Sequence, residues 1–251
     1  DLALYLAFFP SLVAGPVNRA AQMLPQIRPQ QMRQVLEPQR ALGLIALAVA
    51  KVFLLSGWLG SEWVDPVFET PGSFSPERIL LAVYGYSLLI YLNFSGYTQL
   101  VTGIALLLGF RLPVNFDAPY AARNLREFWT RWHISLSTFI RDYLYIPLGG
   151  NRRGPWLATL NMFLAMLVSG LWHGASLNFL IWGALHGVGL ALYKLWASVC
   201  PRSAGWPGTE LLARLLTFHY VALAWIFFRA TSLENAPVSY THSPSPRDKR
   251  Q

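Results

Sequence analysis

Long apolar runs, separated by short polar loops, extend from the first residues of the chain to about residue 235. A helix that crosses the hydrocarbon core of a membrane needs about 20 mostly apolar residues. The pattern predicts an all-α fold, a polytopic transmembrane helical bundle, with candidate membrane segments at 2–17, 41–60, 79–97, 98–110, 157–173, 177–199 and 211–228. The run at 98–110 is too short to span a membrane alone, so we expect a half-helix or a re-entrant segment buried in protein.

The chain contains no internal repeat and no obvious linker, which indicates one domain over residues 1–235. Residues 236–251 are polar, charged and rich in proline and serine. Such a segment cannot bury enough apolar surface to fold alone, so we predict a disordered tail. The chain begins at Asp1 and enters an apolar run at once, without a visible signal peptide. We therefore expect the chain to be part of a longer protein and to be incomplete at both of its own ends.

Composition supports a membrane environment. The chain is 54% hydrophobic and only 13% charged, whereas soluble domains are about 25% charged. The net charge of +8 comes from arginines in short loops between apolar runs. That is the pattern of cytoplasmic loops in membrane proteins and argues against nucleic-acid binding. Cys200 is the only cysteine, which excludes an internal disulfide and any CxxC metal or redox site.

The loop charges also predict an orientation. Residues 17–40 carry four arginines and one acid, whereas residues 60–78 carry four acids and one arginine. The positive-inside rule then assigns the first loop to the cytoplasm and the second to the outside. Residues 111–153 hold seven arginines against three acids, which assigns them to the cytoplasmic face as well.

A polar stretch at residues 126–154, REFWTRWHISLSTFIRDYLYIPLGGNRRG, interrupts the apolar pattern. If residues 127–146 are helical, positions four apart share one face, which here holds Trp129, His133, Ser137 and Arg141. An ionisable side chain inside a membrane is costly and usually serves a site, so His133 is a candidate functional residue. The alternative is an interfacial amphipathic helix whose arginines contact lipid phosphates.

The end of this stretch predicts irregular backbone. Pro147 and Gly149-Gly150 break the run, so residues 134–146 are expected to form a short helix or a re-entrant element. Irregular backbone at membrane depth is tolerated only against protein or a water-filled cavity. The sequence therefore predicts a cavity nearby.

A second polar site lies in the stretch SGLWHGASLNFLIWGALHG at residues 169–187. His173 stands between Trp172 and Gly174 at the end of an apolar run. A neutral imidazole with a pKa near neutrality is a competent general base. The alternative is a core histidine hydrogen-bonded between helices. His186 is interpreted as a packing residue.

Other chemistries are not supported by the sequence. It contains no GxSxG elbow, no Walker A loop and no HExxH motif. Histidines without a nearby carboxylate cluster make a poor metal site, so no bound metal is expected. Asp142 is expected to pair with a neighbouring arginine.

Three stretches together resemble the membrane-bound O-acyltransferase (MBOAT) family, in the bacterial branch that acylates alginate and teichoic acids. They are YLNFSGYTQLVTGIALLLGFRLPVNFDAPY at 91–120, EFWTRWHISLSTFIRDYLYIPLGGNRRG at 127–154 and SGLWHGASLNFLIWGALHG at 169–187. Relatives often carry acids where this chain has Asn93 and Gln99, which leaves the subfamily open.

The resemblance implies a membrane acyltransferase built around a central tunnel. The catalytic histidine of the family maps to His173, and its second site histidine maps to His133. The resemblance also implies a donor such as acetyl-CoA or another acyl thioester, without a tightly bound cofactor. The expected acceptor is a hydroxyl of an extracytoplasmic, alginate-like polysaccharide, and the expected partner is a periplasmic acyltransferase. The protein would be a multi-pass protein of the bacterial inner membrane, in contact with lipid.

Further candidates for substrate binding complete the predicted site: Trp129, Ser137, Arg141, Arg152, Arg153, Trp172 and Asn178. Arg152 and Arg153 are candidates for holding the donor's phosphates at the cytoplasmic mouth, and a basic loop at a membrane face is the alternative. The competing interpretation of the whole chain is a non-enzymatic conduit or an assembly scaffold of a polysaccharide export complex. The lack of an inverted repeat does not favour transport.

Overall fold

A computed structural model of the 251-residue chain describes residues 1–11, 15–28, 33–200 and 208–230. The described residues are mostly helical, and their only bridge between extended segments joins Phe116 to Trp132. Five helices in this part of the chain are long and apolar enough to cross a membrane: Pro38–Glu69, Pro76–Leu107, Pro155–His173, Leu177–Val199 and Thr209–Arg229. The predicted all-α polytopic fold is confirmed.

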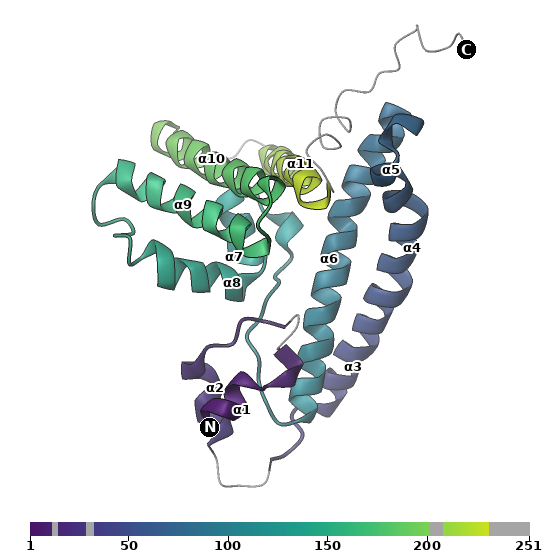
Figure 1. The fold of residues 1–251 in the computed structure, drawn as a ribbon, viewed down its shortest axis with the longest axis vertical. Coiled ribbons are helices and arrows are strands. Elements are labelled where there is room, and N and C mark those ends of the chain that lie inside the picture. The colour runs from purple at the N-terminus through teal and green to yellow at the C-terminus, as the bar shows by residue number, and fades with distance from the viewer. Residues whose placement is uncertain (12–14, 29–32, 201–207, 231–251) are drawn as a thin grey trace, which may run out of the picture.

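The first two spanning helices form an antiparallel pair (Figure 1). The first is continuous through α3 (Pro38–Val49), a π-helical segment (Ala50–Ser56), α4 (Gly57–Leu59), a second π-helical segment (Gly60–Val64) and α5 (Asp65–Glu69). The second is α6 (Pro76–Leu107), which Ser75 caps by accepting a hydrogen bond from the Arg78 backbone N–H. Each has 32 residues and is about 48 Å long.

Two sequence predictions were wrong in this part of the molecule. The segments 79–97 and 98–110 are a single helix as far as Leu107, so 98–110 is not a separate re-entrant element. The predicted span at 2–17 is also absent from the described residues, because this part of the chain forms only α1 (Leu2–Leu6) and a short 3-10 turn at Phe9–Ser11. The following α2 (Ala20–Ile27) is short as well, and all three lie beside the lower end of α6 in Figure 1.

The remaining spanning helices are α9 (Pro155–His173), α10 (Leu177–Val199) and α11 (Thr209–Arg229), close to the predicted bounds. Small residues allow α9 and α10 to pack closely. A Cβ atom at Gly183 would lie 2.5 Å from the Met166 carbonyl oxygen, and one at Gly187 would lie 2.6 Å from the Phe163 ring. Close backbone approach of this kind is how transmembrane helices gain packing energy without a hydrophobic driving force.

The polar stretch between these two groups folds as α7 (Leu125–Arg131), α8 (Ile134–Ile140) and a π-helical turn (Arg141–Tyr145). Trp132 is extended and pairs with Phe116, and His133 adopts a left-handed backbone with φ 43°. The predicted continuous helix over 127–146 is therefore wrong, and Trp129, His133, Ser137 and Arg141 do not share one face. The short helix predicted at 134–146 is present as α8 and its π-helical turn.

The two ends of the bundle agree with the separation that the loop charges predicted. Arg111 forms an ion pair with Glu37, which joins the loop after α6 to the start of α3. At the other end, Arg229 contacts Asp65 at 2.9 Å, and the Asn178 amide donates to the Ala230 carbonyl oxygen at 2.7 Å. The start of α10 therefore lies at the same end as the 60–78 loop. The predicted tail at 236–251 lies outside the described residues.

Candidate active site

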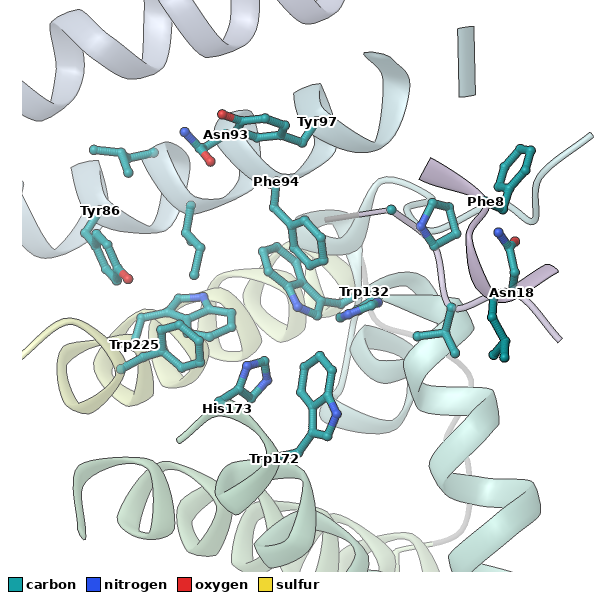
Figure 2. A pocket seen from close by; sticks show the side chains of 18 of the residues that line it. Phe8, Asn18, Tyr86, Asn93, Phe94, Tyr97, Trp132, Trp172, His173 and Trp225 are labelled. Carbon is teal, nitrogen blue, oxygen red and sulfur yellow. The ribbon is translucent and has the colours of Figure 1, made fainter. Parts of the chain in front are cut away.

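A cavity of about 880 Å³ lies between α6, the end of α9 and α11. Figure 2 shows Trp172 and His173 on one side, Trp225 of α11 beside them, and Phe94 of α6 opposite. His133 and Trp132 form a further part of the wall, and the loop at 15–18 contributes another. Both histidines that the sequence singled out therefore line one cavity, although they lie 40 positions apart in the chain.

His133 is held by a buried hydrogen-bond network. Its Nδ1 lies 3.1 Å from the Oδ1 atom of Asn115, which also accepts from the Ser135 hydroxyl at 2.7 Å and the Ser135 backbone N–H at 3.2 Å. The Ile134 N–H donates to the Asn115 carbonyl oxygen at 3.0 Å. His133 and Asn115 are 4% and 1% exposed. The network fixes the position of the imidazole ring.

The same network determines which nitrogen of His133 carries the proton. A backbone N–H can only donate, so the atom of Asn115 that faces Ser135 is its oxygen. An amide oxygen can only accept, so Nδ1 of His133 is the donor. Burial, together with the neighbouring His173, lowers the pKa of His133 to about 3, so the ring is neutral at neutral pH. In this tautomer Nε2 carries a lone pair.

The wall that contains His133 is tied to the N-terminal loop. The Val17 backbone N–H donates to the Ser135 hydroxyl at 2.9 Å, and Arg19 contacts Asp142 at 2.6 Å. Asp142 also accepts from Arg141 at 2.7 Å, which confirms the predicted pairing of this acid with a neighbouring arginine. Hydrogen bonds from Arg141 and Arg19 hold the pKa of Asp142 below its usual value. The loop at 15–18 is thus fastened to the element that carries His133.

His173 is held by aromatic rings rather than by hydrogen bonds. It is the last residue of α9 and packs against Phe228 with ring centroids 4.9 Å apart, and against Trp182 at 5.3 Å. Among the described residues the structure gives its ring nitrogens no hydrogen-bond partner. The ring centroid of Trp172 lies 4.9 Å from that of His173 and 6.3 Å from that of His133, so its ring is close to both. His173 can therefore exchange protons with a molecule in the cavity.

The other predicted site residues lie elsewhere. Trp129, Ser137 and Arg141 line a separate pocket of about 180 Å³ between α7, α8 and α9. Asn178 is buried and joins α10 to the end of α11. Arg152 and Arg153 are exposed in the turn before α9 and do not line the cavity. Of the predicted substrate-binding residues, only Trp172 is in the cavity.

His186 has the packing environment expected for it. It is fully buried, its ring is parallel to that of Phe128, and it contacts Trp129 and Trp182. Trp182 separates it from His173. His186 does not line the cavity.

Sequence reasoning missed Asn115 and the aromatic residues of α6 and α11 that line the cavity. Asn115 lies in LPVNFDAPY, where a polar amide among apolar residues is a signal for a buried hydrogen-bonding role. Trp225 and Phe228 carry no such signal, because aromatic residues are frequent throughout the apolar runs.

The model of the MBOAT, membrane-bound O-acyltransferase family, matches residues 1–207. The chain belongs to this family. The resemblance found in the sequence is thus confirmed, and so is the prediction of a multi-pass membrane protein. The chain is 39% identical to a peptidoglycan O-acetyltransferase of Helicobacter pylori over 94% of its length and 45% of that protein. It is 38% identical to a Pseudomonas aeruginosa protein named Probable alginate O-acetylase AlgI over 94% of its length and 44% of that protein.

A more distant relative is a teichoic acid D-alanyltransferase of Bacillus subtilis, 26% identical over 90% of this chain and 60% of that protein. The chain spans slightly less than half the length of the two O-acetyltransferase relatives. The names of these relatives share transfer of a small acyl group to a polymer. They differ in the polymer and, for the D-alanyl enzyme, in the acyl group.

Proposed function

We propose that the protein is a membrane O-acyltransferase that moves acetyl groups from a cytoplasmic thioester donor, such as acetyl-CoA, towards hydroxyls of an extracytoplasmic polysaccharide. The observation that carries this proposal is the pair of histidines, His133 and His173, in one cavity between membrane helices. The O-acetyltransferase relatives support acetyl as the acyl group. An alginate-like exopolysaccharide remains the proposed acceptor, and peptidoglycan is the alternative that the Helicobacter relative supports.

The proposed chemistry follows from the two different surroundings of the histidines. His133 offers only a lone pair at Nε2, so it accepts a hydrogen bond from a neighbouring hydroxyl of the acceptor sugar and orients that sugar. His173 takes the proton of the reacting hydroxyl as general base while the oxygen of that hydroxyl forms a bond to the thioester carbonyl carbon. The C–S bond then breaks, and the departing sulfur takes the proton back from His173. No cofactor is consumed, because the donor thioester is itself a substrate.

The walls of the cavity suit this reaction. Trp172, Phe94, Trp225 and Phe228 give the cavity an apolar wall beside the histidines, and electrostatic interactions are stronger where bound substrate displaces water. A role for Arg152 and Arg153 in holding the donor's phosphates stays a prediction. A periplasmic partner acyltransferase is likewise proposed, from resemblance to the family.

The deciding experiment is transfer of label from external radiolabelled acetyl-CoA to purified alginate, with peptidoglycan as a second acceptor, enclosed in the lumen of inverted membrane vesicles that contain the chain. We expect label in the polymer with the wild-type chain and none above background with His173→Ala at equal protein level. If polymer stays unlabelled with both the wild-type chain and His173→Ala, while cells that carry either chain still export polysaccharide, the non-enzymatic conduit is the correct interpretation.

A further inference from the structure

A second large pocket, of about 710 Å³, lies far from His173. We call it the Arg126–Lys194 pocket, after the cations of α7 and α10 that line it. Lys194 is 17 residues along α10 from Leu177, the residue that starts this helix next to His173, which corresponds to about 25 Å at 1.5 Å per residue. None of the described residues that line this pocket also lines the histidine cavity.

The charge of the pocket is positive and uncompensated. Arg123 and Arg131 both pair with Glu127, but Arg126 between them has no carboxylate partner among the described residues. Lys194 donates to the Pro155 carbonyl oxygen at 3.2 Å, which carries no net charge. The described lining contains no acidic residue. A pocket of this kind favours an anionic group.

An apolar pocket continues from the charged one. The pocket of about 180 Å³ beside α8 shares three lining residues with it: Tyr145, Met162 and Leu190. Its wall is largely apolar, and its one cation, Arg141, is already paired with Asp142. A cationic space with an apolar extension fits an amphiphile that has an anionic head and a hydrocarbon chain.

Aromatic residues indicate the depth of the pocket in the membrane. Trp196 lines it and is 67% exposed, and Trp156, at the start of α9, is 88% exposed. Tyr193 lines it as well. Tryptophan and tyrosine with this exposure are typical of the boundary between hydrocarbon and water, where lipid headgroups lie.

We propose that the Arg126–Lys194 pocket binds a phospholipid with an anionic headgroup. The headgroup phosphate lies between Arg126 and Lys194, and one acyl chain enters the apolar extension. Basic pockets between transmembrane helices recognise anionic lipid headgroups by the same charge complementarity. This site is independent of the proposed acyl transfer, because it involves no residue of the histidine cavity.

The test is native mass spectrometry of the purified, delipidated chain titrated with phosphatidylglycerol or with phosphatidylcholine of the same acyl chains. We expect one phosphatidylglycerol to be retained, with phosphatidylcholine bound at least about tenfold more weakly. The double variant Arg126→Gln/Lys194→Gln should lose this preference. The matched control Arg28→Gln/Arg40→Gln removes two exposed cations elsewhere and should keep it. Equal retention of phosphatidylglycerol by both double variants would overturn the proposal.

Two further arms distinguish a lipid from a soluble phosphate compound. Ala165→Leu reduces the apolar extension and should weaken phosphatidylglycerol binding. Glycerol phosphate, which has the head without the chains, should fail to displace the lipid at equal concentration. Displacement by glycerol phosphate, with no effect of Ala165→Leu, would mean that the pocket holds a water-soluble phosphate compound. If the double variant does not yield folded protein, Lys194→Gln alone should still weaken phosphatidylglycerol binding, and an unchanged affinity would overturn the proposal.

Discussion

The two histidines of the cavity are held in opposite ways. His133 is 4% exposed, sits on a left-handed backbone and donates to Asn115 in a buried network. His173 ends a long helix, is only partly buried and is surrounded by aromatic rings that make no hydrogen bond to its nitrogens. One ring has a fixed tautomer and a fixed direction, whereas the other is free to gain and lose a proton.

This difference indicates that the two histidines have different roles in the proposed reaction. A group that orients a substrate benefits from a rigid surrounding, because misplacement by a fraction of an ångström lowers the rate. A general base must change its protonation state in each cycle, and hydrogen bonds that favour one state would oppose that change. The geometry is therefore better suited to His173 as the base and His133 as the orienting residue than to the reverse.

The largest predicted effect is that of His173→Ala. Loss of a general base lowers the rate by about 10²–10⁴-fold. Acetyl transfer to polysaccharide in membrane vesicles is the measurement, with protein level and detergent-extracted monodispersity as controls for folding. A variant that retains more than a tenth of wild-type transfer would contradict the role assigned to His173.

His133→Ala should lower transfer by a smaller factor, roughly tenfold to a hundredfold, because it removes orientation and leaves the base in place. The double variant His133→Ala/His173→Ala should be little worse than His173→Ala alone, since residues that act as a unit are not additive. Effects that multiply independently in the double variant would show that the two histidines serve separate steps.

Substitutions at Asn115 sharpen the comparison, because they change the surrounding of His133 without touching either histidine. In Asn115→Asp, a carboxylate faces Nδ1, stabilises the charged imidazolium and raises the pKa of His133 from its lowered value. Protonation removes the lone pair at Nε2, so the acidic limb of the rate–pH profile should move to higher pH. Asn115→Ala should lower kcat by about tenfold without moving that limb, since one buried hydrogen bond is lost. An unchanged profile for Asn115→Asp would contradict the tautomer assigned to His133.

The smallest predicted effect is that of Arg19→Gln, which weakens the attachment of the N-terminal loop to Asp142. Ion pairs at partly exposed positions contribute only about 0–1 kcal/mol, so transfer should fall by fivefold at most. Because the loop at 15–18 lines the cavity, the change should appear in KM for the acceptor rather than in kcat. A large fall in kcat would indicate that this loop has a direct part in the reaction.

Much of the helical frame could be predicted from hydropathy alone. The segments 157–173, 177–199 and 211–228 differ from the observed helices by no more than two residues at either end. The prediction for 98–110 was wrong because Asn93, Ser95 and Thr98 interrupt the apolar run, although they are compatible with a long helix. Ser95 and Thr98 are buried, and Asn93 donates to Ser56 of the neighbouring helix, so the polar groups face protein rather than lipid.

The candidate site was predicted in part. The cost of an ionisable group in lipid is a general argument, and it singled out His133, which lines one cavity together with His173. The helical periodicity around His133 failed because Trp132 pairs with Phe116, a contact between segments 16 residues apart that no local pattern encodes. Trp129, Ser137 and Arg141 consequently face a different pocket from His133.

The left-handed backbone of His133 has a consequence for which substitutions position 133 can accept. The position makes two demands, a φ of 43° and an imidazole that points into the cavity. Glycine and asparagine satisfy the first demand at low cost, but neither supplies the second, and β-branched residues satisfy neither. His173 faces only the chemical demand, because it ends an ordinary helix. Under mutational scanning, position 133 should therefore tolerate fewer residue types for stable expression than position 173, even though His173 contributes more to the rate.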